Sequence, residues 1–429
     1  MSIPTARGES AGSVARPLLH EPETTGERKA FWASWFGWGL DAFDNWLYVY
    51  SLTAIIAALG ISRAQGGSLA TASLVCSALG GIFSGALADR IGRKRMLMIS
   101  VLWYAFFTAL SGTAQHFGEL VVFRALQGFG FGGEWAVGSV LISEWASSQH
   151  RGRTLGFMQG AWAVGWLVAN FAFQVVFALA GPNPGWRYLF FLGILPALLV
   201  FYVRREVEDA PVYVETKRAK DVKGDRSFTL AALFTPGIVR TTLFTTLLAV
   251  GIQGGYWAIV TWLPGYLSSE RHLTALSTGA YFYPLIVGSY IGYVTAGFIH
   301  DAIGRRPTFL IFAIGSAVFV PLYTFFVQAN WQLLVLGPFL GYFASGIHTG
   351  FGPYMTELFP SSMRGAGQGF AYNVGRGFAG FGPLVVGILA ATHPLGVAIS
   401  IYAPACYVLA MIALLFLPET RGKELVPLD

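Results

Sequence analysis

The sequence is poor in charged residues. Only 12% of its 429 residues are charged, whereas 54% are hydrophobic, and a soluble globular chain carries about 25% charged residues. A soluble protein of this length could not cover its surface with so few charges. The composition therefore excludes a cytosolic enzyme, a disordered protein and a nucleic-acid-binding module. It indicates an integral membrane protein with room for many spans, since one spanning helix takes about 20 residues.

Cysteine is also scarce. The two cysteines, Cys76 and Cys406, lie in apolar runs and have no histidine or cysteine at metal-ligand spacing. We therefore expect two small buried side chains, with no metal site and no cofactor. No signal peptide is visible, because the N-terminal residues are polar and lack an apolar core behind a basic start. We predict a disordered tail over residues 1–30.

Twelve apolar runs follow one another along the chain, six before a polar, basic stretch and six after it. This pattern predicts an all-α membrane protein with two six-helix bundles, over residues 31–203 and 238–417. A linker over 204–237 would join them, and a tail over 418–429 would follow. The predicted spans are 31–57, 67–88, 96–115, 118–143, 154–180, 187–203, 238–268, 274–299, 308–328, 331–356, 366–391 and 395–417.

The distribution of positive charge predicts the topology. With the N-terminus in the cytoplasm, 23 of the 28 Lys and Arg residues fall in cytoplasmic segments. Three fall outside, namely Arg63, Arg187 and Arg271, and two lie within spans, Arg124 and Arg376. This asymmetry supports twelve spans with both termini in the cytoplasm. The net charge of +6 is thus a topology signal and does not indicate affinity for nucleic acid.

The two halves repeat each other in sequence. One motif recurs 212 residues later, and a second motif recurs 213 residues later. The matched pairs are Gly85/Gly297, Asp89/Asp301, Gly92/Gly304, Arg93/Arg305, Glu144/Glu357, Arg151/Arg364, Gly152/Gly365 and Gly156/Gly369. Two motifs in nearly one register indicate a duplicated six-span unit, which predicts two similar bundles around a central cavity.

The first motif resembles the signature loop of the major facilitator superfamily. It reads Gly85-x-Leu87-Ala88-Asp89-Arg90-x-Gly92-Arg93-Lys94. Arg124-x-x-Gln127-Gly128 in the fourth span and Pro418-Glu419-Thr420-Arg421-Gly422 after the last span are also similar to that superfamily. The resemblance covers about residues 30–425 and implies a transporter with the fold of that superfamily, with no enzymatic activity and with protons as the coupling ion.

Two carboxylates lie within the first span. Asp41 and Asp44 belong to a stripe of residues at spacings of three and four, which is one face of a helix. The stripe consists of Ser34, Gly37, Asp41, Asp44, Tyr48 and Ser51. Ionisable groups within a span are costly to bury, and we interpret both as proton-coupling candidates. The alternative is a pair of structural carboxylates held by a buried partner.

The fourth span carries its own polar face, with Arg124, Gln127, Phe131, Glu134 and Gly138. Arg124 and Glu134 could pair with the span 1 carboxylates in neighbouring helices. Glu134 is a third proton-coupling candidate, although its flanking glycines equally suit a structural hydrogen bond.

Arg376, in the eleventh span, lies near the midplane with no acidic residue in its own span. A guanidinium there matches a carboxylate, and we interpret it as a clamp for an anionic substrate. The alternative is a structural ion pair with Asp41, Asp44 or Glu134.

Other polar and aromatic residues at midspan are candidates for contact with the substrate. With Arg376, the substrate-binding candidates are Asn373, Tyr372, Arg124, Gln127, Gln159, Trp166, Gln253, Tyr256, Trp257 and His348. Many of these aromatics, and a lone histidine such as His348, equally suit packing. So many of them beside glutamines suggest an amphipathic substrate of medium size.

The duplicated loops carry charges that we interpret as gates. We expect the helix ends to lie close together at these loops. An aspartate and an arginine there can form a latch between helices that opens and closes. The gate candidates are Asp89, Arg93, Glu144, Arg151, Asp301, Arg305, Glu357 and Arg364.

Asp41-Ala-Phe-Asp44 resembles the paired aspartates of the organic-acid:proton symporters. Gly132-Gly133-Glu134-Trp135 and Tyr372-Asn373-Val374-Gly375-Arg376 are similar to their sialate and monocarboxylate branch. Aromatic-acid carriers have glycine where Ala42 stands, which makes them the second choice. Drug exporters have a Gly-Pro motif in the fifth span, which contains no proline here.

The resemblance therefore implies a proton-coupled importer of a small organic anion, which works by alternating access in the plasma membrane, a bacterial inner membrane. The anion would be a monocarboxylate, a sialate or an aromatic acid, and we expect a monomer in the lipid bilayer. Two alternatives remain: a transporter of a neutral solute such as a sugar, and a membrane receptor without transport activity.

Overall fold

The structure of the protein is a computed structural model that describes residues 25–145, 151–198, 200, 230–360 and 363–422. Within these residues the chain is helical in each of the twelve predicted spans. The first six correspond to α1 (Thr25–Leu59), α2 (Arg63–Ile91), α3 (Arg93–Ser111), α4 (Phe117–Trp145), α5 (Arg151–Ala180) and α6 (Pro182–Leu192) with the short helix η1 (Leu195–Leu198). Helix α1 thus begins before the predicted boundary at residue 31, inside the stretch that we expected to be a tail.

The second six spans follow a short helix, η2 (Leu230–Phe234), and two of them are broken. They correspond to α9 (Val239–Ser269), α10 (Ala275–Ile303), α11 (Arg305–Thr324), α12 (Asn330–Gly346) with η3 (Ile347–Gly350) and α13 (Phe351–Leu358), α14 (Arg364–Ala379) with α15 (Gly382–Leu389), and α16 (Leu395–Leu415). The break between α14 and α15 lies just after Arg376, where Gly380 and Gly382-Pro383 interrupt the helix.

Length and hydropathy agree with a membrane fold. Eight helical segments within the described residues are each long and apolar enough to cross a membrane. Large apolar side chains also point outward from the bundle, for example Leu79, Phe83, Phe171 and Ile388, which are all more than half exposed. A soluble protein rarely exposes so many. In a bilayer these side chains contact lipid.

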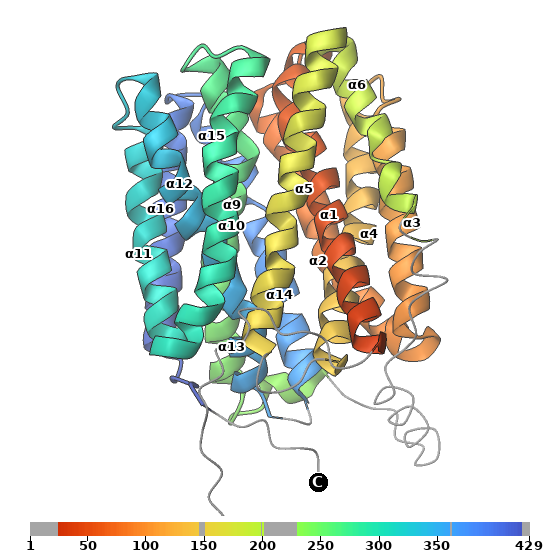
Figure 1. Ribbon diagram of the computed structural model, residues 1–429, viewed down its shortest axis with the longest axis vertical. Helices are drawn as coiled ribbons and strands as arrows, with labels where there is room; N and C mark the ends of the chain where they lie inside the picture. Colours follow the sequence, from red (N-terminus) through yellow and green to blue (C-terminus); the bar gives the residue numbers. More distant parts are fainter. Residues whose placement is uncertain (1–24, 146–150, 199, 201–229, 361–362, 423–429) are drawn as a thin grey trace, which may run out of the picture.

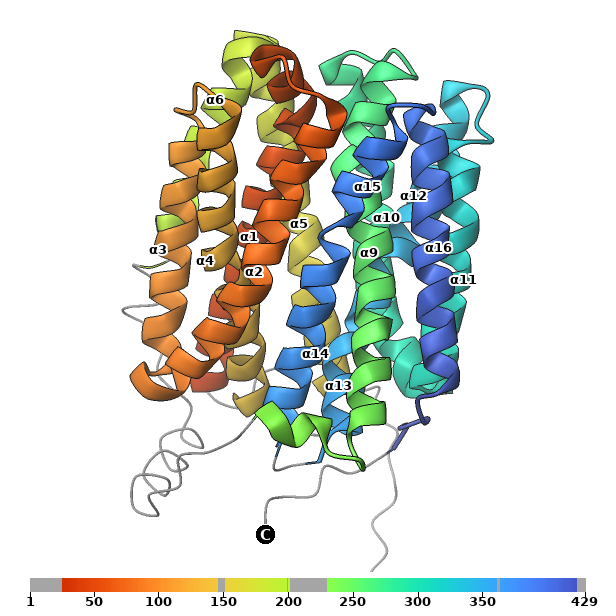
Figure 2. The ribbon, with the colours of Figure 1, turned by 180° about the vertical axis from the view of Figure 1, so that it is seen from behind.

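The two halves form two bundles that stand side by side (Figures 1 and 2). The duplication is visible in the backbone, because Gly92 ends α2 with φ 101° and Gly304 ends α10 with φ 105°. Residues other than glycine rarely adopt such a positive φ, so glycine is required at both positions. Each of these tight joints turns the chain directly into the next helix, α3 or α11.

Helix packing within the bundles repeats in the same register. A Cβ on Gly128 of α4 would lie 2.0 Å from the backbone oxygen of Ser73 in α2. A Cβ on Gly341 of α12 would lie 2.0 Å from the backbone oxygen of Leu285 in α10. These glycines let helix backbones touch, as membrane bundles require. The packing of α2 on α4 therefore has its counterpart in the packing of α10 on α12.

Two pairs of spans form most of the contact between the bundles. Helix α5 packs on α10, and α2 packs on α14 and α15. The α5–α10 contact includes hydrogen bonds from Asn170 Nδ2 to the Gly279 backbone oxygen (2.9 Å) and from Gln174 Nε2 to the Tyr283 hydroxyl (2.8 Å). These interfaces surround the centre of the molecule, where α1 also approaches α9.

The bundle is closed at the end opposite the start of α1 and the end of α16. We call the closed end the far end, and the end where α1 begins and α16 ends the termini end. At the far end, a Cβ on Gly67 of α2 would lie 2.3 Å from the backbone oxygen of Pro383 in α15. A Cβ on Gly387 would lie 2.6 Å from the Arg63 backbone oxygen, and Arg63 Nη1 donates to the Ala390 oxygen at 3.3 Å. The two bundles therefore meet there backbone to backbone.

This contact predicts that Gly67→Val opens the far end. The two methyl groups of valine cannot occupy the space taken by the α15 backbone, so the closed state loses stability relative to an open one. Labelling of a cysteine introduced by Ile259→Cys, in a chain without Cys76 and Cys406, should accelerate about ten-fold, since about 1–3 kcal/mol shifts a population by about 5–150-fold.

Gly118→Val is the matched control, because a Cβ on this exposed glycine of α4 has no described atom within 4 Å. Unchanged labelling in both variants would show that the α2–α15 contact does not decide which end is open.

Candidate functional site

The polar stripe of α1 is a buried face of the helix. Asp41, Asp44 and Ser51 are each 0% exposed, as the spacing of the stripe predicts for a face turned to neighbouring helices. Asp44 Oδ2 accepts a hydrogen bond from Gln127 Nε2 of α4 at 2.6 Å. Gln127 Oε1 in turn accepts one from Ser73 Oγ of α2 at 2.8 Å. A chain of hydrogen bonds therefore connects the Asp44 carboxylate to α4 and to α2.

Arg124 is the charged neighbour of Asp44. Its guanidinium carbon lies 4.3 Å from the centre of the Tyr48 ring, and its charge interacts with the Asp44 carboxylate. Arg124 is 1% exposed, and its Nε and Nη1 have no hydrogen-bond acceptor among the described residues. The structure thus places Arg124 and Gln127, two of the predicted substrate contacts, inside the first bundle beside Asp44.

The other two proton-coupling candidates are less well defined. Asp41 lies one turn from Asp44 on the same buried face. The side chain of Glu134 lies outside the described residues. The structure therefore brings Asp44 and Arg124 together, as the spacing on spans 1 and 4 suggested, and it adds the Gln127 bridge.

Arg376 lies where the two bundles meet. Its guanidinium carbon is 5.3 Å from the ring centre of Phe131, on α4 of the first bundle, and 4.8 Å from that of Tyr372 on its own helix. Arg376 Nη2 donates to the Tyr372 hydroxyl at 3.0 Å. The residue is 1% exposed, yet Nε and Nη1 have no acceptor among the described residues. A buried cation with unused N–H groups at the bundle interface can bind an anion.

The neighbours of Arg376 tie α14 to α2. Asn373 Nδ2 donates to the Gly369 oxygen at 2.9 Å, and its Oδ1 has no donor among the described residues. A Cβ on Gly81 of α2 would lie 2.4 Å from this oxygen. Two turns further on, Gly380 packs against the Leu74 side chain. Because Leu74 adjoins Ser73, the Asp44 chain and the Arg376 helix contact neighbouring residues of α2.

Aromatic residues fill the centre beside Arg376. Trp162 of α5 donates from Nε1 to the Tyr256 hydroxyl of α9 at 2.8 Å, and its ring also contacts Trp257. The Tyr256 ring lies 4.6 Å from the His348 ring, and Phe351 contacts both the His348 ring and the ring of Tyr372, whose hydroxyl accepts from Arg376. The predicted contacts Tyr256, Trp257 and His348 are therefore brought together with Arg376.

The remaining substrate-binding candidates hold helices together or line the centre. Gln253 Nε2 donates to the Tyr372 backbone oxygen at 3.1 Å, which joins α9 to α14. Trp166 Nε1 donates to the Tyr50 hydroxyl at 2.9 Å. Gln159 is half-buried on α5.

Comparison with known proteins identifies the family. The sequence pattern of the Major Facilitator Superfamily matches residues 34–295 and 285–428. The chain belongs to the Major Facilitator Superfamily. It is 35% identical to the probable 4-methylmuconolactone transporter of Cupriavidus pinatubonensis over 92% of this chain and 91% of that protein. It is 32% identical to the cis,cis-muconate transport protein of Acinetobacter baylyi over 89% of this chain and 92% of that protein.

A solved structure shows the same fold. The proton:xylose symporter XylE of E. coli superposes with a TM-score of 0.72 at 18% identity, over 94% of this chain and 98% of that chain. At this identity the similarity establishes the fold alone. Membership of the Major Facilitator Superfamily makes the protein a membrane transporter and not an enzyme, as the repeated loop motif implied.

The superfamily loop motif of the second half forms an ion-pair network at the termini end. Arg305 Nη1 lies 2.8 Å from Asp301 Oδ1, and its Nε and Nη2 lie 3.1 and 2.8 Å from the two oxygens of Glu357. Glu357 Oε2 also accepts from Thr420 Oγ1 at 2.5 Å. The structure therefore joins three of the predicted gate residues, all within the second bundle.

Among the other gate candidates, the structure describes the side chain of Arg364. Arg364 donates from Nε to the Thr356 backbone oxygen at 2.9 Å, so its described contact is with the end of α13. The side chains of the first-half candidates, Asp89, Arg93, Glu144 and Arg151, lie outside the described residues.

Glu419 is a structural residue whose contacts we did not predict. Its carboxylate accepts hydrogen bonds of 2.8 to 2.9 Å from the backbone N–H groups of Arg305, Arg306, Thr420 and Arg421. It thereby caps the start of α11, where a negative charge is favourable. Burial alone would raise the pKa of Glu419, but these donors hold it below its ordinary value of 4.5. Its place in the Pro418–Gly422 motif was the only signal in the sequence.

The cap predicts that Glu419→Gln lowers the melting temperature in detergent at neutral pH. The carboxylate stabilises the folded state fully above its unfolded pKa of about 4.5. This stabilisation is lost as the pH falls through the lower pKa of the folded state. Melting curves of the two proteins should therefore converge in acid. A difference in melting temperature that stays constant through the acidic range would mean that the cap depends on the shape of the Glu419 side chain and not on its charge.

Proposed function

We propose that this transporter imports a small organic anion together with protons, and that Arg376 binds the anion. The observation that carries the proposal is Arg376 itself. It is buried at the bundle interface, and its Nε and Nη1 lack an acceptor among the described residues. An unpaired buried cation is costly. A carboxylate that enters from the central cavity would both neutralise it and use these donors.

The similarity to named carriers supports the choice of substrate. Two relatives at 32–35% identity carry the names of a muconate and a methylmuconolactone transporter. Both share nearly their full length with this chain. Muconate carries the carboxylate groups that an arginine clamp would recognise, so the relatives and the buried cation favour the same chemical class.

Asp44 is the proton site in this proposal. It is fully buried, its Oδ1 has no hydrogen-bond donor among the described residues, and its other oxygen is bound to Gln127. Protonation would remove the negative charge beside Arg124 and weaken the Gln127–Ser73 link to α2. Since α2 also packs on α14 close to Arg376, a change at Asp44 can alter the contact between the bundles. Asp41 and Glu134 remain further candidates for this role.

The excess of Lys and Arg at the termini end supports a cytoplasmic position of that end. With this orientation the far end, closed by Gly67 and Gly387, faces outward. The anion would then bind from outside when the α2–α15 contact opens, and it would leave toward the cytoplasm after the bundles rock back.

Uptake into proteoliposomes tests the substrate class. We expect labelled cis,cis-muconate or benzoate to enter vesicles that contain the protein, and xylose to be excluded. Uptake of xylose without uptake of acids would favour the neutral-solute alternative. The absence of any uptake, in protein that folds, would favour a receptor. Empty vesicles give the rate of passive entry, which matters for acids that cross lipid in their neutral form.

A further inference from the structure

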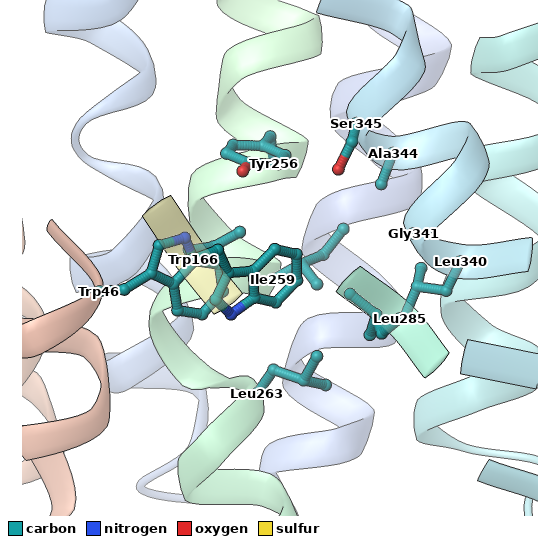
Figure 3. A pocket seen from close by; sticks show the side chains of 11 residues that line it. Trp46, Trp166, Tyr256, Ile259, Leu263, Leu285, Leu340, Gly341, Ala344 and Ser345 are labelled. Atoms are coloured by element: carbon teal, nitrogen blue, oxygen red, sulfur yellow. The ribbon is translucent and has the colours of Figure 1, made fainter. Parts of the chain in front are cut away.

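A small cavity lies between the two halves, and Tyr256 forms part of its lining. Trp46 of α1 and Trp166 of α5 form its wall on the first bundle. Tyr256, Ile259, Leu285 and Leu340 line it on the second (Figure 3). In this closed state it has room for about one water molecule. Because its walls belong to different bundles, rotation of one bundle against the other would widen it.

The first wall is flat, rigid and aromatic. The indoles of Trp46 and Trp166 stack with ring centres 3.9 Å apart and planes 7° from parallel. The Phe282 ring meets both edge-on, at 5.9 and 5.7 Å. Trp166 is fixed further by its hydrogen bond to the Tyr50 hydroxyl. Aromatic walls of this kind favour contact with the flat face of another π-system.

Nearly all polar atoms of the lining are already engaged. Ser345 Oγ donates to Ser289 Oγ at 2.9 Å, and the Tyr256 hydroxyl accepts from Trp162. Trp46 Nε1 is the exception, since it is buried and has no acceptor among the described residues. The cavity therefore offers mostly apolar surface and few free donors.

A layer of aromatic side chains that contact one another lies between the cavity and Arg376. The Tyr256 ring forms a wall of the cavity and also contacts the His348 ring at 4.6 Å. The Tyr256 hydroxyl also accepts from Trp162, whose ring centre lies 6.5 Å from that of Phe131, and the Phe131 ring centre is 5.3 Å from the guanidinium carbon of Arg376. A molecule that spans this layer would have its charged end at the guanidinium and its other end against the tryptophans.

We propose that the Trp46–Trp166 cavity is the subsite for the body of the substrate, and that this body is planar and apolar. The proposal rests on the proposed function, because Arg376 supplies the anchor for the carboxylate. The preferred substrates are acids with a flat, unsaturated or aromatic body that carries at most one further polar group, such as a second carboxylate, to which Trp46 Nε1 would donate. Polyhydroxylated acids are excluded, because each hydroxyl would lose its water and find no partner.

Three acids of seven carbons and one carboxylate test this subsite: benzoate, cyclohexanecarboxylate and quinate. Calorimetry on the purified full chain measures their dissociation constants. We expect benzoate to bind most tightly, cyclohexanecarboxylate more weakly, and quinate weaker than benzoate by about 100-fold or more, since several unpaired hydroxyls are buried. Quinate that binds as well as benzoate, or benzoate that does not bind, would overturn the inference.

Trp46→Leu keeps apolar bulk but removes the ring, and we expect it to weaken benzoate binding by about ten-fold. Trp186→Leu is the matched control, because Trp186 is equally buried on α6 with an unpaired Nε1 among the described residues, away from the site. Equal losses in both variants would overturn the assignment. Should Trp46→Leu fail to fold, binding of benzoate to Trp46→Phe and the ranking of the three acids still test the assignment of the subsite.

The same titrations separate this inference from the proposed function. Unchanged benzoate affinity in Arg376→Ala would contradict the role of Arg376 as anion clamp, but it would not contradict the subsite. Loss of affinity in Arg376→Ala, together with no preference of the wild-type protein among the three acids, would support the anion clamp and overturn the subsite.

Discussion

Arg376→Ala is expected to abolish binding of the organic anion in a protein that still folds. Truncating one partner of a buried charge pair costs about 2–5 kcal/mol or more, which is a factor of at least about 30 in affinity. Arg376→Lys should also bind more weakly, by about ten-fold or more, because an ammonium lacks the planar set of donors. Calorimetric titration with benzoate or cis,cis-muconate measures both changes.

Arg187→Ala serves as the control for removal of a partly buried arginine. Arg187 Nη1 bonds to the backbone oxygens of Gly112 and Ala114 at the far end of the first bundle, outside the central site. Its loss should leave affinity for the anion unchanged. Normal affinity in Arg376→Ala would move the clamp elsewhere, with Arg124 as the next choice.

Asp44→Asn is expected to abolish accumulation against a gradient while exchange of substrate continues. The amide has nearly the shape of the carboxyl group and can still accept the bond from Gln127, but it cannot take up a proton. Uphill uptake needs proton binding, whereas exchange of labelled for unlabelled anion needs only the movement of the loaded carrier. Counterflow in proteoliposomes therefore separates coupling from transport.

Asp41→Asn is the second variant in this experiment, because both aspartates lie on the same buried face. Ser51→Ala is the control, since Ser51 is on that face, is fully buried and has no hydrogen-bond partner among the described residues. Normal accumulation in both aspartate variants would show that α1 does not carry the proton.

Hydrophobic runs predicted the twelve spans because a membrane helix must be long and continuously apolar. The breaks escaped this reasoning. The helix stops between α14 and α15, yet the run over 366–391 stays apolar through the break. Gly380 and Gly382-Pro383 were the available signal, and they place the break one turn beyond Arg376.

Spacing along single helices predicted part of the site. The stripes on spans 1 and 4 indicated which faces are buried, and hence that Asp44 and Arg124 could meet. Periodicity does not say which helix of the other bundle lies opposite. The Phe131–Arg376 contact and the Trp46–Trp166 stack therefore could not be predicted, and Trp46 lies off the polar stripe of α1 altogether.

Accumulation of labelled cis,cis-muconate in proteoliposomes with an imposed pH gradient tests the proposed transport most directly. With the outside acidic, we expect the internal concentration to rise above the external one, and a protonophore to abolish the rise. Arg376→Ala should show no uptake and Asp44→Asn only equilibration. Uptake by the wild-type protein that reaches only equal concentrations, with or without the gradient, would contradict proton coupling.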